Sequence, residues 1–232
     1  MRLKLWHAAV FVLALVGFAI AYAPAAVFAP RSSAGFSYAR AEGTVWRARF
    51  EGVRLGPYDA GDLNWRLSAL ELLNGRLNGE ARFRGGAVRG GVRMIANLAG
   101  DRRIVAEQLE VDGAPLGTLM LAGATSARGI DVAFVGGRCH FGQGDLRSDV
   151  LSRNAAALSM RGPELSGGGI CDGETAKFAL AGAQGDAQVR VLLELRPNGE
   201  GRWRADAFNA TGEAEITAAL AGLNGELRWF PF

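Results

Sequence analysis

The sequence predicts an all-β fold, in which an N-terminal transmembrane helix is followed by an antiparallel, Gly-rich β-sheet domain. Polar and apolar residues alternate in short runs along most of the chain, as in strands with one face on a core and one face in water. The 33 glycines, against only 7 prolines, separate these runs and indicate many tight turns. No long amphipathic helical pattern follows residue 29, so we expect hairpin connections rather than helical crossovers.

The clearest strand pattern lies in the first third of the chain. Leu63, Trp65 and Leu67 alternate with polar neighbours, which places the three apolar side chains on one face of a strand. Residues 44–50 are predicted to form a neighbouring strand that brings Trp46 to the same layer.

The rest of the chain continues this pattern with weaker signals. Further strands are predicted at residues 80–84, 88–95, 104–111, 116–121, 130–135, 178–183, 188–196, 202–208, 214–220 and 226–230. Residues 52–57 are predicted to be a loop, residues 68–73 one helical turn or a bend, and residues 151–158 a short helix. Because Asn and Gly tolerate the positive φ that type I′ turns require, hairpin turns are predicted at Asn74-Gly75 and Asn78-Gly79. A further turn is predicted at Asp112-Gly113.

An almost uninterrupted apolar run extends over residues 5–23, after a basic lead that contains Arg2 and Lys4. A helix of this length, rising about 1.5 Å per residue, nearly spans the hydrocarbon core of a membrane. The two basic residues orient the N-terminus toward the cytoplasm by the positive-inside rule. The sequence therefore predicts a single membrane anchor with the bulk of the chain on the side of the membrane away from the cytoplasm.

A cleaved signal peptide is the alternative interpretation of this run. Small residues with A-x-A-like spacing occur at residues 23–25 and 27–29. However, Pro24 and Pro30 directly follow two of the candidate cleavage points, and the apolar run is longer than the usual signal-peptide core. We favour the anchor.

The charge balance argues against nucleic acid as a partner. The net charge is only +3, and the basic residues are spread along the chain rather than gathered in a block. Binding of a phosphate backbone requires a concentrated positive surface, which this sequence does not predict.

Four motifs follow one another in the first third of the chain: Gly43-Thr44-Val45-Trp46, Leu55-Gly56, Trp65-Arg66-Leu67 and Leu72-Leu73-Asn74-Gly75-Arg76-Leu77. This ordered set resembles the start of the type II secretion system protein N family. The resemblance implies a non-enzymatic inner-membrane component of the general secretion pathway of Gram-negative bacteria. Such a component supports the export of folded proteins from the periplasm across the outer membrane. Its implied partners are other components of this system, either the inner-membrane platform or the secretin.

With this resemblance, we expect three parts: residues 1–29 as the cytoplasmic tip and anchor, 30–41 as a linker, and 42–232 as the periplasmic β domain. The shape of the domain has two solutions, a sheet closed on itself or a long curved sheet that leaves a groove. The resemblance and the meandering hairpins favour an elongated, twisted sheet.

Cys139 and Cys171 are the only cysteines, and each follows a Gly-Gly-x sequence. Two thiols in similar local sequences, in an oxidising periplasm, predict a disulfide between nearby strands. The alternative is two separate buried thiols that behave as small apolar side chains.

The sequence offers no catalytic or cofactor site. His140 is the single imidazole outside the apolar run, which is too few ligands for a metal site with the cysteines. On a strand, the side chains of His140 and Cys139 point to opposite faces, so the imidazole cannot easily activate the thiol. No phosphate-binding glycine motif occurs. We therefore expect neither an enzyme, a cofactor, nor a small-molecule substrate.

Aromatic residues give two further expectations. Trp46, Trp65 and Trp203 fall on apolar faces and are expected in the core, unless the sheet leaves a groove that they would line. The C-terminus ends in Trp229-Phe230-Pro231-Phe232, and these aromatic residues are candidates for a partner contact. The second hypothesis for the whole protein is a periplasmic lipid-binding or envelope-biogenesis protein similar to the AsmA-like family, which requires an accessible apolar groove.

Overall fold

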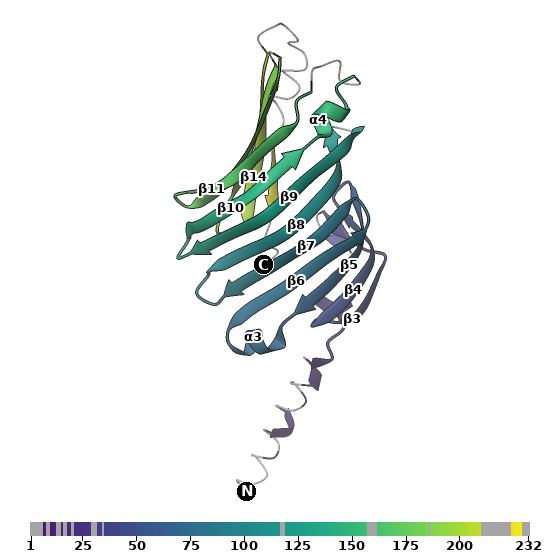
Figure 1. Ribbon diagram of the computed structural model, residues 1–232. Helices are drawn as coiled ribbons and strands as arrows, with labels where there is room; N and C mark the ends of the chain where they lie inside the picture. The colour runs from purple at the N-terminus through teal and green to yellow at the C-terminus, as the bar shows by residue number, and fades with distance from the viewer. Residues whose placement is uncertain are drawn as a thin grey trace.

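A computed structural model describes residues 32–33, 35–116, 119–156, 162–185, 187–209 and 224–228, together with scattered residues between 7 and 28. Fifteen strands in these residues form one sheet, drawn in Figure 1. They are β1 (Ser32–Ser33), β2 (Phe36–Ser37), β3 (Arg40–Thr44), β4 (Arg47–Leu55), β5 (Tyr58–Leu67), β6 (Arg76–Gly85), β7 (Val88–Asn97), β8 (Arg102–Leu116), β9 (Leu119–Val135), β10 (Arg138–Ser148), β11 (Leu165–Asp172), β12 (Thr175–Gln184), β13 (Ala187–Leu195), β14 (Glu200–Asn209) and β15 (Asn224–Arg228).

The sheet is an antiparallel meander. Its strand order is β1-β2-β4-β5 and then each strand in sequence order to β15, while β3 pairs with β4 beside this path. Among the elements whose bounds are described, the helices α2 (Ala25–Phe28), α3 (Ala69–Leu73) and α4 (Val150–Arg153) are short and lie in connections or before the sheet. The predicted antiparallel all-β fold is therefore confirmed for the described residues.

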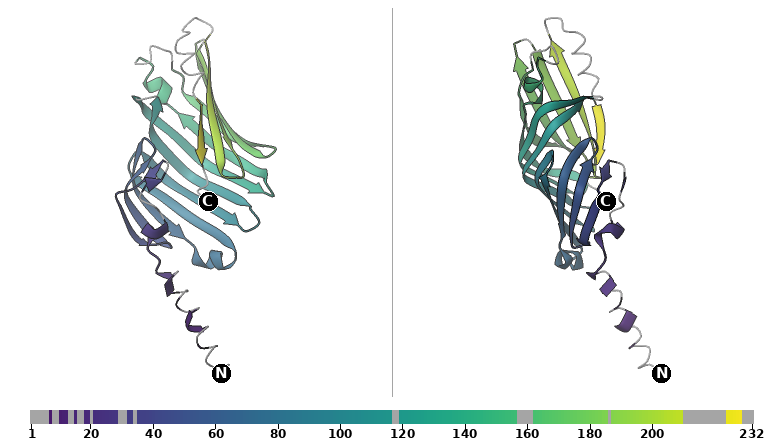
Figure 2. Two further views of the ribbon diagram at one scale, coloured as in Figure 1. Left: turned by 180° about the vertical axis from the view of Figure 1, so that it is seen from behind. Right: turned by 90° about the vertical axis from the view of Figure 1, so that its right-hand side faces the viewer.

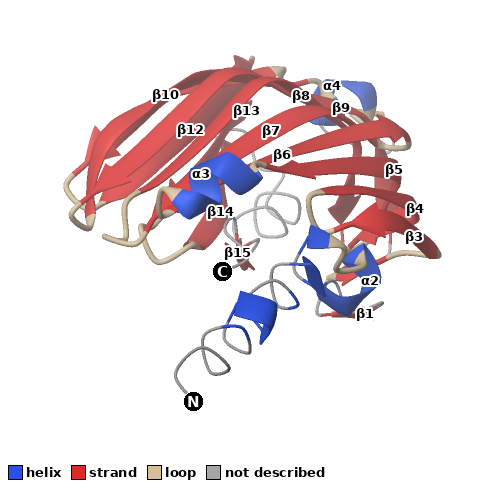
Figure 3. Ribbon diagram, turned by 90° about the horizontal axis from the view of Figure 1, so that it is seen from below, coloured by secondary structure: helices blue, strands red, loops and turns tan. Residues whose placement is uncertain are grey.

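The sheet is a single curved layer. Figures 1 and 2 show that the strand direction changes progressively from β4 to β14, and Figure 3 shows the strands as an arc when seen from below. Strand register places the buried side chains of neighbouring strands on one face: Leu63 lies opposite Phe50 and Phe83, and Phe178 lies opposite Leu193. We call this the apolar face. It is the inner side of the arc, because side chains of a single layer converge and bury one another only there.

The apolar face holds two clusters of buried residues. One lies on the N-terminal strands and contains Tyr38, Phe50 and Val53, with the aromatic rings of Tyr38 and Phe50 packed edge to face at 5.1 Å. The other extends from β8 to β13 and contains Phe134 and Phe178, which are 1% and 2% exposed. Both clusters use the inward-facing residues of the alternating runs, so burial of this face accounts for the strand pattern of the sequence.

The first hairpin differs from the prediction. Residues 44–50 are not one strand, because the chain reverses at Val45 and Trp46 between β3 and β4. Val and Trp have high strand propensity, so the turn carries no Asn-Gly or Pro signal of its own. The glycine that makes this turn possible is Gly43, whose φ is +92°.

Several predicted breaks are bulges inside longer strands. β4 continues through Gly52, with a register shift between Phe50 and Val53, so residues 52–57 are not all loop. The predicted turn at Asp112-Gly113 is likewise a register shift within β8. The predicted strand 116–121 instead includes the end of β8, at Leu116, and the start of β9, at Leu119, and the predicted strand 130–135 is the last part of the same long β9. A glycine with positive φ allows a bulge as readily as a turn.

The two predicted Asn-Gly turns have different outcomes in the structure. Asn74 caps the C-terminal end of α3 with φ −89°, and Gly75, with φ +69°, leads into β6. The helical turn predicted at residues 68–73 is confirmed, but Asn74-Gly75 ends this helix and does not form a type I′ hairpin turn. Gly79 instead lies inside β6, opposite Leu67 and Met94. The predicted turn at Asn78-Gly79 is wrong.

Other expectations concern the ends of the chain. Residues 30–41, expected to be a linker, contribute β1, β2 and the start of β3. Among the described residues, none belongs to a helix that is long and apolar enough to cross a membrane, and much of the predicted anchor at 5–23 falls outside this part. The predicted helix at 151–158 is shorter in the structure, since α4 ends at Arg153 and residues 154–156 form a turn. The predicted strand at 214–220 and the tail 229–232 lie outside the described residues. The anchor stays a prediction.

Candidate functional site

The first motif, Gly43-Thr44-Val45-Trp46, forms the β3–β4 turn. A Cβ atom added to Gly43 would lie 2.3 Å from the carbonyl oxygen of Arg47. Its φ of +92° is also unfavourable for a residue with a side chain. Both constraints require glycine where the chain reverses into β4.

Trp65 connects the next strand to this turn. Its indole N–H donates a hydrogen bond to the carbonyl oxygen of Val45 at 3.2 Å. The backbone N–H of Leu67 donates to the carbonyl oxygen of Trp46 at 2.9 Å. These two bonds join two motifs that are about twenty residues apart in sequence, and they hold the turn against the end of β5.

Gly79 makes room for the Trp65 ring. A Cβ atom at position 79 would lie 2.5 Å from Cη2 of Trp65 and 3.0 Å from Cζ2. We missed this residue in the sequence because its position after Asn78 is typical of a turn. The signal that would have found it is the register, which places Gly79 beside the strand that carries Trp65.

The remaining motif residues surround the core rather than fill it. Leu55 ends β4 before the β4–β5 turn, where Gly56 has φ +58°. Leu67 and Leu77 are partly buried, and Leu73 is 84% exposed at the end of α3. The buried positions on these strands are instead residues outside the motifs: Val53 and Ala60 are fully buried, and Ala48, Phe50, Leu63 and Ala81 are nearly so.

The segment after the N-terminal apolar run docks on the same turn. The backbone N–H of Val45 donates to the carbonyl oxygen of Ala23 at 3.0 Å, and Pro24 forms an isolated bridge with Thr44. Ala25, in α2, is 4% exposed and belongs to the N-terminal buried cluster. The chain therefore leaves the apolar run at the β3–β4 turn.

Several large side chains on the apolar face are only half-buried. They share this face with the buried residues of the same or neighbouring strands and extend from β5 to β14: Trp65, Phe83, Met94, Ile104, Ile130, Leu193 and Trp203. Trp203 lies opposite Leu193, as the aligned face of residues 202–208 predicts. The apolar face is thus continuous across the sheet, and part of it remains accessible.

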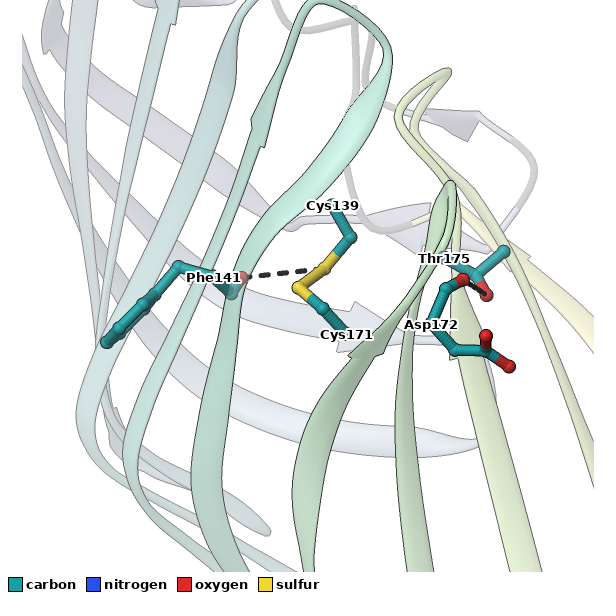
Figure 4. The surroundings of a disulfide bond; sticks show 5 residues. All are labelled: Cys139, Phe141, Cys171, Asp172 and Thr175. Carbon is teal, nitrogen blue, oxygen red and sulfur yellow. Dashed lines mark hydrogen bonds between the residues drawn. A yellow bond between two sulfur atoms is a disulfide. The ribbon is translucent and has the colours of Figure 1, made fainter.

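Cys139 and Cys171 form the predicted disulfide. They lie on the neighbouring strands β10 and β11, with an S–S distance of 1.99 Å and a Cα–Cα distance of 5.4 Å. Figure 4 shows the bridge between the two strands, with the sulfur of Cys139 near the carbonyl oxygen of Phe141. Among the described residues, no group of three or more His, Cys, Asp or Glu side chains could hold a metal ion.

The opposite, polar face carries a hollow of about 540 Å³ over β4, β5 and β6. Arg47 and Arg66 are directly opposite each other in the register, and both are exposed. Glu80 lies opposite Arg66 but is bound by Arg82 at 2.5 Å. Like charges side by side on neighbouring strands are unfavourable, so the arginine pair forms a local positive site.

Other charged contacts of the sheet and its turns are ordinary surface contacts. Arg49 binds Asp62 at 2.7 Å, and this hydrogen bond raises the pKa of the exposed Arg49 guanidinium. Asp101, between β7 and β8, accepts hydrogen bonds from the Asn97 side chain and the Gly136 backbone, which lower the pKa of its carboxyl group. These charges stabilise turns and ladders and do not converge on a reaction centre. Trp229, Phe230 and Phe232 lie outside the described residues.

The described residues define a single-sheet β protein, whose distinctive parts are a continuous apolar face and a first hairpin held by hydrogen bonds to Trp65 and Trp46. The family model for type II secretion system (T2SS), protein N, matches residues 34–228, and the chain belongs to this family. The predicted resemblance is confirmed and extends from the first motifs to β15. No curated protein and no solved structure matches the chain. The family is that of a secretion component.

Proposed function

We propose that this protein is a non-enzymatic inner-membrane component of the type II secretion system, which supports the export of folded proteins from the periplasm across the outer membrane. The observation that carries this proposal is the family match over residues 34–228, which includes nearly all of the described sheet. The inner membrane holds the protein through residues 5–23. The N-terminus is cytoplasmic and the sheet is periplasmic.

Two features support this location. Arg2 and Lys4 precede the apolar run and favour a cytoplasmic N-terminus. The Cys139–Cys171 disulfide suits an oxidising compartment such as the periplasm. The docking of Ala23 on the β3–β4 turn would place the sheet directly beyond the membrane.

The partners are other components of the secretion system, in the inner-membrane platform or the secretin. Among the described strands, β15 pairs only with β14, so its other edge can accept a strand from a partner. The aromatic tail 229–232 follows β15 directly. We assign the partner contact to this edge together with Trp229, Phe230 and Phe232. Neither nucleic acid nor a small-molecule substrate is required.

The test is a clean deletion of the gene in its native host, with a secreted hydrolase assayed separately in the medium and the periplasm. We expect activity to accumulate in the periplasm and to return to the medium when the intact gene is restored. A gene that lacks residues 229–232 should restore secretion less well if the tail contacts a partner. Unchanged secretion in the deletion strain would contradict the proposed role.

The half-buried residues of the apolar face favour a second candidate, the binding of a lipid acyl chain. Phe83 and its neighbours present apolar surface that the sheet alone does not fully bury. A photo-cross-linking amino acid at Phe83, on the apolar face, should then capture lipid in cells. The same amino acid at Arg82, the adjacent residue on the polar face, is the matched control. Equal capture at both positions, or none at Phe83, would contradict lipid binding.

A further inference from the structure

Four exposed leucines gather at one end of the sheet. Leu70, Leu72 and Leu73 in α3 are 75%, 44% and 84% exposed, and Leu98, in the β7–β8 turn, is 92% exposed. The Cδ1 atom of Leu98 lies 3.3 Å from the position of a Cβ atom on Gly75, just after α3. A single exposed leucine is common, but a group on adjacent turns indicates a surface that meets an apolar partner. We call these four residues the leucine tip.

The leucine tip lies at the end of the sheet where the N-terminal segment leaves. Figures 1 and 2 show α3 and the described parts of that segment at the same lower end of the molecule. Hydrogen bonds connect the two: Val45 binds Ala23, and Leu67 binds Trp46. Ser68, the next residue, caps α3 by accepting a hydrogen bond from the Glu71 backbone.

Positive charge lies beside the leucine tip. Arg47 begins β4, immediately after the β3–β4 turn, and Arg66 is the penultimate residue of β5, just before α3. The two exposed guanidinium side chains are opposite each other in the register. An anionic group near this end would relieve the repulsion between them.

We propose that this end of the sheet rests on the periplasmic leaflet of the inner membrane, with the leucine tip inserted at the boundary of headgroups and acyl chains. Arg47 and Arg66 contact the phosphates of anionic lipids. Apolar side chains inserted beside basic residues are the usual chemistry of interfacial membrane contacts. This inference rests on the anchor proposed above. It adds a second contact, which fixes the orientation of the sheet on the bilayer.

The experiment uses the full-length chain in phosphatidylcholine vesicles with or without phosphatidylglycerol. Both native cysteines are in the disulfide, so an introduced cysteine is the one reactive thiol under non-reducing conditions. An environment-sensitive fluorophore is attached at Ala99→Cys, next to Leu98. The matched control is Pro57→Cys in the β4–β5 turn, at the opposite end of the hairpin. Nitroxide-labelled lipid should quench the probe at position 99 and leave the probe at position 57 unquenched.

Two variants separate the parts of the contact. Replacement of Leu70, Leu73 and Leu98 by serine in the Ala99→Cys protein should abolish quenching while circular dichroism keeps the β signal. Arg47→Gln with Arg66→Gln should reduce quenching in vesicles that contain phosphatidylglycerol and not in phosphatidylcholine alone. If the serine substitutions do not change the quenching, the proposed role of the leucine tip is wrong. If neither the lipid charge nor the two arginine substitutions change the quenching, the proposed contact with lipid phosphates is wrong.

Flotation of the same vesicles distinguishes this inference from the anchor. If the protein floats and the probe at position 99 behaves like the probe at position 57, the leucine tip does not meet lipid and the anchor stands. The exposed leucines would then be a surface for another protein. If the protein does not float, the anchor fails, and the inference about the leucine tip fails with it.

Discussion

The ring of Trp65 occupies the space that a side chain at position 79 would need, since a Cβ atom there would lie 2.5 Å from Cη2. Trp65 cannot easily move away, because its indole N–H is bonded to the carbonyl oxygen of Val45. One glycine on β6 therefore supports the turn between β3 and β4, two strands away. This relationship connects the family motifs in space and leads to the first prediction.

Gly79→Ala should destabilise the protein by about 1–3 kcal/mol, because the added methyl group forces the Trp65 ring out of its position. Urea unfolding followed by tryptophan fluorescence measures this change. The matched control is Gly91→Ala on β7, where the added atom meets only ordinary contacts at 3.6 Å and 3.8 Å. Equal stability of the two variants would show that Trp65 relaxes without cost.

Loss of the disulfide should lower the free energy of unfolding by about 3–4 kcal/mol, by the chain-entropy relation for a separation of 32 residues. The measurement is chemical unfolding of Cys139→Ser with Cys171→Ser. Reductant should bring the native protein to the stability of this double variant and should leave the variant unchanged. A native protein that is indifferent to reductant would contradict the prediction.

Arg202→Ala should destabilise the protein by about 1–3 kcal/mol, since it removes the cation bound to a buried carboxylate. Glu194, its partner on β13, is 8% exposed. The control is Arg40→Ala, whose partner Glu42 has a side chain that is 48% exposed, and this change should stay within about 0.5 kcal/mol. Thermal unfolding of both variants is the measurement. Similar losses in both would mean that the burial of Glu194 has no energetic effect.

Asp149 should make stability depend on pH in the acidic range. Its carboxylate accepts a hydrogen bond from the Ala124 backbone at 2.6 Å, which together with Arg153 lowers the pKa of this carboxyl group below its ordinary value. Its stabilising contribution is therefore present above the unfolded-state pKa and is lost as pH falls through the lower folded-state pKa.

Asp149→Asn keeps the shape of the side chain and one acceptor, so it should cost only about 1 kcal/mol at neutral pH. Below about pH 4, the difference in unfolding free energy between the native protein and this variant should shrink. Denaturant unfolding at a series of pH values measures it. A difference that stays constant into strong acid would contradict the assignment.

Local patterns predicted most of the strands because each strand pairs with its neighbour in sequence. The alternation around Leu63, Trp65 and Leu67 needed no distant contact to be interpreted. The two cysteines could be paired because they are the only two in the chain and each follows Gly-Gly-x, although the strands β10 and β11 that carry them were not predicted. The β3–β4 turn was missed because Val45 and Trp46 resemble strand residues. The space for Trp65 was missed because Gly79 resembles a turn residue.

The sequence by itself determined the antiparallel meander, the disulfide and the family, since these depend on periodicity, residue type and motif order within short distances. Only the tertiary structure decided which apolar residues are buried. Leu63 and Phe50 meet across one register and are buried, whereas Leu73 and Leu98, equally apolar, lie on turns at the end of the sheet and stay exposed. The curvature and register of the sheet depend on the pairing and twist of many strands together, so no local sequence pattern predicts them.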